Sequence, residues 1–336
     1  MSDASTGVPA TGGVHCETTA LGALLGHAGI HLAEPVLFGL GSGLSFVYWD
    51  SKRQSAPFLG GRVKPFELTR TLARRLGLDL RVQETSSARR GWDQVRTLVD
   101  DGVPVGLQLD SHDLDYFGSR VHFAGHVVAL LGYDEESAYL LDTAQQGGRV
   151  RTSLESLARA RAARGPMSAP HRSFTLGPLR EPVDPVPAIV PAIVECAEAF
   201  LDPPIANVGH RGIRTTAKRA PSWLDRVEDP PRDLPQMAML MERAGTGGAL
   251  FRTLYRDFLT ACLPLLDDGA GPGGRVAAVE RGRDLYAESA TLWTRVAGLV
   301  ERAGLDGDPA GLTEAAGLLL RIADLETAAM TTLRSL

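Results

Sequence analysis

Cys16 and His126 are the residues of this sequence best suited to chemistry, since a thiol beside an imidazole forms a nucleophile with its own base. Cys16 follows Gly12–Gly13 and opens an apolar-periodic segment over 16–29, which predicts a helix that begins at the cysteine. The N–H groups and the dipole of a helix start favour an anion, and therefore the thiolate. From position alone, a buried cysteine that serves as a small hydrophobic residue stays open as the alternative.

A hairpin is predicted further along the chain. Segment 125–133 is rich in β-branched residues and predicts a central strand, and after a short polar turn 138–141 predicts a strand that pairs back. His126 then opens the first strand and Asp142 follows the second, so both lie at one edge of the sheet, where the carboxylate can orient and charge the imidazole. Taken singly, a core histidine and a turn aspartate are the alternatives. Together with Cys16 they indicate a papain-like thiol nucleophile.

Four segments resemble the butirosin-biosynthesis acyltransferase H family and the domain of unknown function that follows it, namely 14–21, 38–46, 125–134 and 242–252. That family is similar in fold to the bacteriocin-processing cysteine peptidases, which are papain-like. The resemblance implies that Cys16 accepts the acyl group, that His126 acts as base and acid, and that Asp142 orients it. The type member of the family moves an aminoacyl side chain from a carrier-protein thioester onto an aminoglycoside amine.

One departure concerns the oxyanion hole. The processing peptidases place a glutamine shortly before the cysteine, whereas residues 12–15 contain none. The backbone N–H of Cys16 and a substitute donor must then stabilise the oxyanion, and His15 is the nearest candidate, although it could equally be a structural neighbour. The missing glutamine weakens a peptidase assignment more than an acyl-transfer assignment.

Two glycine-rich segments are candidates for substrate binding. Gly41, Ser42 and Gly43 follow an apolar run, where glycine allows close approach of a substrate and serine can donate a hydrogen bond; an ordinary tight loop is the alternative. The segment lacks the lysine of a phosphate-binding loop. Further on, Thr246 precedes a helix that starts near Ala249, where it either caps the helix or contributes to an anion site.

A polar loop over 110–121 carries several groups that could imitate a metal site, namely His112, Asp113, Asp115 and, just beyond it, His122. We interpret this loop as a polar lid beside the cleft, and we expect no metal. Cys196 and Cys262 lie among apolar residues of predicted helices and are expected in the core.

The elements around these residues predict an α+β fold: a papain-like domain with an antiparallel sheet, followed by an all-α domain. Residues 1–13 are expected as a disordered tail, 14–176 as the catalytic domain, 177–191 as a proline-rich linker and 192–336 as the helical domain. Other predicted helices of the catalytic domain cover 66–76 and 92–101, and other strands cover 103–109 and 172–176. Helices of the second domain are predicted over 192–201, 213–227, 234–244, 249–266, 276–303 and 312–333.

Composition excludes several classes of protein. The 336 residues hold 35 Lys+Arg against 40 Asp+Glu, a net charge of −5 without a basic block, which argues against a nucleic-acid partner. Three cysteines form neither a disulfide framework nor a zinc motif. No signal peptide is visible, and no apolar run approaches the roughly 18 residues of a membrane span, so a cytoplasmic protein without membrane contact is expected.

The expected function is a cysteine-dependent acyltransferase of natural product and antibiotic biosynthesis that needs no cofactor. Its partners would be an acyl carrier protein, which presents a phosphopantetheine thioester, and a small-molecule amine that receives the acyl group. A peptidase, amidase or thioesterase with the same triad stays open, because water could replace the amine. A non-catalytic carrier-binding protein would not need the triad. A homodimer through the helical half also stays open, since its apolar stripes fit its own core equally well.

Overall fold

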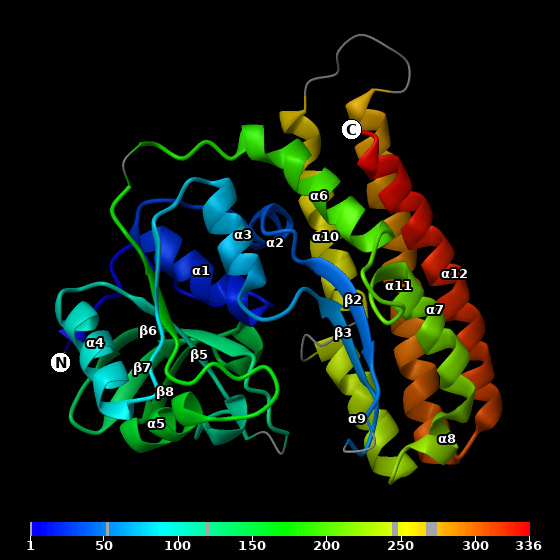
Figure 1. Ribbon diagram of the computed structural model, residues 1–336, viewed down its shortest axis with the longest axis horizontal. Helices are drawn as coiled ribbons and strands as arrows, with labels where there is room; N and C mark the ends of the chain where they lie inside the picture. The colour runs from blue at the N-terminus through cyan, green and yellow to red at the C-terminus, as the bar shows by residue number, and fades with distance from the viewer. Residues whose placement is uncertain (1, 52–53, 119–120, 180, 244–247, 267–273) are drawn as a thin grey trace. The chain divides into compact units, whose positions relative to one another are not determined.

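The computed structural model describes residues 2–51, 54–118, 121–179, 181–243, 248–266 and 274–336 (Figure 1). The chain forms two compact units. Unit 1 comprises Met1–Leu37 and Lys64–Pro185, and unit 2 comprises Phe38–Val63 and Val186–Leu336. The expected domain boundary after residue 176 differs from this division, because residues 38–63 group with the helical half of the chain.

Unit 1 contains the following elements: β1 (Ser2–Asp3), α1 (Cys16–His27), the start of α2 (Glu34–Leu40), α3 (Glu67–Arg75), β4 (Leu80–Gln83), α4 (Ala88–Asp100), β5 (Val105–Leu109), η1 (Ser111–Asp113), β6 (His126–Tyr133), β7 (Ser137–Leu141), η2 (Ala144–Gln146), β8 (Arg149–Ser153), α5 (Leu154–Ala162) and β9 (Ser173–Leu176). Among the described residues its sheet has seven strands in the order β4-β9-β5-β6-β7-β8, and β1 pairs with β6. All of these pairings are antiparallel, so the predicted α+β class is confirmed.

The core of unit 1 forms on one face of this sheet. Residues of β5, β6 and β7 alternate between the two faces, and their apolar side chains pack against α4 and α5. The contributing residues include Val95, Leu107, Val128, Leu140 and Leu157. After His126, residues 127–131 of β6 are apolar because the strand lies in the middle of the sheet and both of its faces are covered.

The first residues of the chain, expected as a disordered tail, have a defined place in unit 1. Ser2 and Asp3 pair with β6, and the Ala4 N–H donates to the Leu131 carbonyl oxygen at 2.6 Å. Ala4 is buried as a result. Composition alone did not reveal that residues 2–3 form a short strand, which pairs with the part of β6 that extends beyond β5.

Unit 2 contains the following elements: β2 (Leu44–Trp49), β3 (Phe58–Arg62), η3 (Val186–Ala188), α6 (Ile189–Leu201), α7 (Gly209–Arg219), η4 (Ala220–Ser222), α8 (Trp223–Arg226), α9 (Pro230–Arg243), α10 (Ala249–Cys262), η5 (Leu263–Leu265), α11 (Arg275–Asp306) and α12 (Pro309–Arg334). The long helices α11 and α12 lie side by side, and α10 packs along α11 (Figure 1). Within the described ranges, no helix combines the length and the apolar character that crossing a membrane requires.

The hairpin of β2 and β3 packs into this helical unit. Phe46 of β2 stacks on Trp293 of α11 with ring centroids 5.5 Å apart, and Phe38 stacks on Phe251 of α10 at the same separation. Gly39 is required beside α10, because a Cβ there would lie only 2.0 Å from the ring of Phe258. These aromatic contacts explain why residues 38–63 belong to unit 2.

The expected linker over 177–191 is shorter in the structure. Helix α6 begins at Ile189, so Pro191 lies in its first turn, where the missing N–H of proline would have had no helical partner. Proline acts differently at Pro221 and Pro264. There it coincides with short 3₁₀ turns that interrupt the helices predicted over 213–227 and 249–266.

Candidate active site

Cys16 is the first residue of α1 and is 8% exposed. The helix forms because residues 20–25 are rich in alanine and leucine, which are good helix formers, and most residues of the helix are buried in unit 1. Its start is fixed by hydrogen bonds rather than by a capping side chain at His15. The thiol is therefore held at a defined position near the surface of the unit.

The Glu34 carboxylate accepts hydrogen bonds at the N-terminus of this helix. It accepts hydrogen bonds from the Val14 N–H at 3.0 and 2.9 Å, from the His15 N–H at 2.9 Å and from the Thr18 hydroxyl at 2.8 Å. Gly13 permits this approach, because a Cβ there would lie 2.4 Å from the carboxylate. The carboxylate thus occupies the N–H groups that precede the thiol. Positive charge that stabilises a thiolate must then come from elsewhere.

His126 supplies that charge. Its Nε2 lies 2.8 Å from Asp142 Oδ2, which leaves Nδ1 for a hydrogen bond with the Cys16 side chain. Burial of the ring opposes its protonation, but the negative charges of Asp142 and Cys16 outweigh this effect and raise the pKa of His126 to about 10. The geometry therefore places a positively charged imidazole beside the Cys16 side chain.

Asp142 is fully buried and has three donors. Its Oδ2 accepts from His126 and from the Tyr116 hydroxyl at 2.7 Å, and its Oδ1 accepts from the Thr143 N–H at 2.6 Å. Burial alone would raise the pKa of Asp142, but the charge of His126 and these hydrogen bonds lower it below the ordinary value. Gly12 lies against the same segment, since a Cβ there would lie 1.8 Å from the Asp142 carbonyl oxygen.

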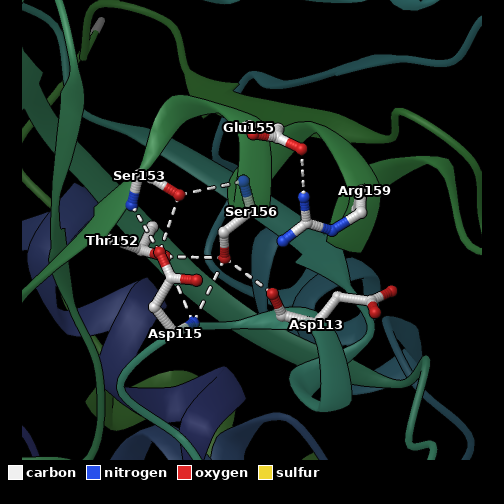
Figure 2. A network of polar contacts seen from close by, with 7 residues as sticks. All are labelled: Asp113, Asp115, Thr152, Ser153, Glu155, Ser156 and Arg159. Atoms are coloured by element: carbon white, nitrogen blue, oxygen red, sulfur yellow. Dashed lines mark hydrogen bonds and ion pairs between the residues drawn. The ribbon is translucent and has the colours of Figure 1, made fainter.

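Tyr116 remains protonated and acts as a donor. Burial and the neighbouring Asp142 charge raise the pKa of Tyr116 far above its ordinary value. A polar network holds its loop in place (Figure 2). In this network the adjacent Asp115 carboxylate accepts from the Ser153 N–H at 2.8 Å and from its hydroxyl at 2.7 Å, while Ser156 Oγ donates to the Asp113 carbonyl at 2.6 Å.

Two residues expected in a metal-like polar lid therefore have structural roles. Asp115 and Asp113 anchor the loop to the start of α5, as just described. The two histidines, His112 and His122, stack on each other with ring centroids 3.9 Å apart. His122 also lies 2.9 Å from Asp110, which accepts hydrogen bonds from the backbone of the loop.

His15, the expected oxyanion donor, is buried at the N-cap of α1. Its Nδ1 lies 3.2 Å from the Thr18 hydroxyl, whose single proton has its closest acceptor in Glu34. In a neutral His15 ring the Nδ1 then carries the proton, and Nε2 is an acceptor. The Cys16 N–H is the other candidate donor to an oxyanion.

The other expected binding residues belong to unit 2 or fall outside the described residues. Gly41, Ser42 and Gly43 belong to unit 2, where they form the turn between α2 and β2. Ser42 has a left-handed backbone with φ of 47°, and its hydroxyl donates to the Ala192 carbonyl at 3.3 Å. Thr246 lies outside the described residues.

The two remaining cysteines are buried in unit 2, as expected for core residues. Cys196 Sγ lies 3.6 Å from the Leu44 carbonyl oxygen. Burial raises the pKa of the Cys262 thiol to about 12, so it is protonated at neutral pH.

Sequence patterns did not identify Glu34 or Tyr116. Glu34 lies on a separate helix, and Tyr116 is an aromatic residue in a loop interpreted as a polar lid. Their roles follow from the folded loops alone, and no motif marks either residue.

Comparisons with known proteins agree with this geometry. The family described as butirosin biosynthesis protein H, N-terminal, matches residues 15–143, which include Cys16, His126 and Asp142. The domain of unknown function DUF4872 matches residues 155–333, more than half of the chain. A comparison with curated proteins gave no match.

Among solved structures, a chain described as a C39-like peptidase from Bacillus anthracis is similar, with 16% sequence identity and a TM-score of 0.35. The match covers 54% of this chain and 100% of that chain. The functional argument therefore depends on the site itself and on the family matches. By these matches the chain belongs to the DUF4872 family, and its residues 15–143 are similar to the N-terminal domain of butirosin biosynthesis protein H.

Proposed function

We propose that the protein is a cysteine-dependent acyltransferase of natural product biosynthesis, which moves an acyl or aminoacyl group from an acyl carrier protein thioester to an amine. The observation that carries the proposal is the buried set of Cys16, His126 and Asp142, with a histidine whose charge favours the thiolate. The N-terminal family match supports a biosynthetic cysteine enzyme.

In the first half-reaction the Cys16 thiolate attacks the carbonyl carbon of the donor thioester. The Cys16 N–H stabilises the oxyanion of the tetrahedral intermediate. Collapse of this intermediate breaks the bond to the pantetheine sulfur, which leaves as a thiol after it takes the proton from His126. The acyl group is then bound to Cys16 as a new thioester, so the exchange is close to isoenergetic.

Acylation also changes the basicity of His126. The Cys16 charge is one of the causes that raise the pKa of His126, and a thioester is neutral. The pKa of His126 therefore falls in the acyl-enzyme, which makes the unprotonated ring available to accept a proton at neutral pH. The amine attacks the acyl carbon, His126 takes its proton, the amide forms and the Cys16 thiolate is released.

Asp142 and Tyr116 position the base without contacting the reacting atoms. Asp142 fixes the orientation of the imidazole through Nε2, and Tyr116 holds the carboxylate in place. Metal ions and nucleotides are not needed for these steps, since aminolysis of a thioester is downhill.

The experiment that tests the proposal is intact-protein mass spectrometry after the protein is mixed with several acyl carrier protein thioesters. We expect a mass increase equal to the acyl group, lost in Cys16→Ser and retained in Cys262→Ser, which removes a buried thiol of unit 2. Discharge of the adduct by amines would establish a transferase. Discharge by water alone would establish the hydrolase instead, and the absence of an adduct with every thioester would contradict the proposal.

A further inference from the structure

Unit 1 contains a second feature that the triad does not use, a pocket of about 310 Å³ beside α3. Its lining includes three cations, Lys64, Arg70 and Arg172, but Glu67 is the one carboxylate among its lining residues. The apolar part of the wall includes Phe66 and Met167.

Two of the three cations of this pocket, Arg70 and Arg172, contact the aromatic ring of Phe66. The guanidinium of Arg70 lies 5.1 Å from the centroid of Phe66, and that of Arg172 lies 4.8 Å from the same centroid. Arg172 is fixed further, because its Nη1 donates to Gln108 Oε1 at 2.6 Å and its Nε donates to Glu84 at 2.8 Å.

Arg70 differs from the other two cations. Lys64 pairs with Glu67 at 3.5 Å, and Arg172 pairs with Glu84. Within the described part of the chain, no carboxylate forms an ion pair with Arg70. Its ring contact therefore leaves the donors of the guanidinium for a ligand.

Two residues of the pocket wall have a strained backbone conformation. Phe66 is buried and has a φ of 72°, and Met167 has a φ of 64°, a left-handed backbone that a bulky side chain adopts only under constraint. Residues held in such conformations cluster at ligand sites. The Phe66 N–H is held by the Glu17 carboxylate at 3.2 Å, and Gln108 donates to the Met167 carbonyl at 2.7 Å.

The same contacts connect the pocket to the catalytic residues. Glu17 directly follows Cys16, and a Cβ on Gly125, which precedes His126, would lie 2.7 Å from Pro65 of the pocket wall. Since neighbouring Cα atoms are about 3.8 Å apart, Phe66 lies on the order of 10 Å from Cys16. The wall of the pocket and the segments that carry Cys16 and His126 are thus in direct contact within unit 1.

We propose that this pocket binds an oxyanion, a carboxylate or a phosphate, carried by the acyl donor. This inference rests on the proposed function, because it assigns the anion to the substrate of Cys16. The amine acceptor is cationic and is repelled by the three cations, whereas the donor can present an acid on its acyl chain or the phosphate of its pantetheine arm. Guanidinium groups bind both oxyanions through paired hydrogen bonds.

The test is isothermal titration calorimetry of the full-length protein with inorganic phosphate, glutarate and 4′-phosphopantetheine as probes. We expect at least one probe to bind, and Arg70→Gln to weaken that binding about tenfold or more. Arg89→Gln is the matched control, since Arg89 is an exposed arginine of α4 in the same unit. Arg70 is itself exposed, and we expect an unchanged melting temperature in both variants.

The pattern of probes identifies the source of the anion. Binding of the phosphate probes alone assigns the pocket to the pantetheine arm, and binding of glutarate alone assigns it to the acyl chain. Equal binding by wild type and Arg70→Gln, or no binding by any probe, would overturn the proposal.

These titrations need no turnover, so they are independent of whether Cys16 is acylated. If an acyl-Cys16 adduct does form, Arg70→Gln should raise the donor concentration that gives half-maximal acylation and leave the maximal rate unchanged.

Discussion

Asp142 in unit 1 and Glu326 in unit 2 are both fully buried carboxylates, yet their partners differ in kind. Glu326 accepts from Arg252 through two nitrogens at 2.8 and 2.9 Å, from Ser289 at 2.6 Å and from Trp293 at 3.0 Å. Asp142 accepts from a histidine, a tyrosine and a backbone N–H.

The difference lies in what can exchange a proton. A guanidinium does not deprotonate in proteins, and the cluster of Glu326 ties α10, α11 and α12 together. An imidazole does titrate, and on its other side His126 faces a thiol. Both clusters contain buried charges. The cluster of Asp142 differs from that of Glu326 because it contains a histidine, which can titrate, beside a nucleophile.

The largest effect is expected from His126→Ala. Removal of the positive charge beside Cys16 should lower the rate of Cys16 alkylation by iodoacetamide at pH 8 by on the order of 100-fold or more. Peptide mass spectrometry would follow the rate, with Cys262→Ser as the variant that should leave it unchanged. An equal rate in His126→Ala would mean that the thiolate does not depend on the imidazolium.

In unit 2 we expect the substitution of the buried carboxylate Glu326 to lower the free energy of unfolding. Glu326→Gln leaves Arg252 as a buried charge without its counter-ion, and we expect a loss of about 3–5 kcal/mol in the free energy of unfolding. Urea unfolding followed by circular dichroism measures this loss. Replacement of both partners by apolar residues, Arg252→Met with Glu326→Leu, should restore most of it, and failure to do so would indicate that Ser289 and Trp293 need the carboxylate.

The two clusters should also respond differently to pH. The pKa of His126 is raised to about 10 in the folded protein, so its protonation contributes stability that is complete below pH 6.5 and is lost as the pH rises to about 10. The wild-type free energy of unfolding should therefore fall over this range more steeply than that of His126→Ala. Parallel pH dependences in the two proteins would contradict the raised pKa.

The smallest effect is expected from Tyr116→Phe. This change removes one hydrogen bond to Asp142, worth about 1–2 kcal/mol, and raises the pKa of Asp142 toward its ordinary value. The acidic limb of the pH–rate profile should move to higher pH with a modest loss of rate. Tyr139→Phe provides the control, because Tyr139 donates to Asp134 at a surface turn, and it should leave the limb in place.

Local patterns predicted the elements around the triad closely. The helix expected over 16–29 is α1, and the strands expected over 125–133 and 138–141 are β6 and β7. Each of these segments has a strong periodicity or a β-branched run of its own. The proximity of His126 and Asp142 follows from one hairpin, which is a local feature, whereas the position of Cys16 beside them depends on the packing of α1 against β6.

Contacts between distant segments were not predictable in the same way. The hairpin of β2 and β3 was missed because β3 contains two glycines and because the hairpin packs against an aromatic ring of a helix far along the chain. Glu34 and Glu17 accept hydrogen bonds from backbone N–H groups. The residue types in a sequence do not show which N–H groups such a carboxylate will bind. Their roles depend on tertiary placement, which single-sequence patterns do not encode.

The division of the chain also has a consequence for the order in which the protein is made. Residues 38–63 leave the ribosome early, but Phe46 packs on Trp293 of α11, so the hairpin has its aromatic partner only after most of the chain has been synthesised. Unit 1 can close as soon as residue 185 has emerged. Until α11 has been synthesised, the side chain of Phe46 therefore lacks the ring on which it stacks in the complete fold.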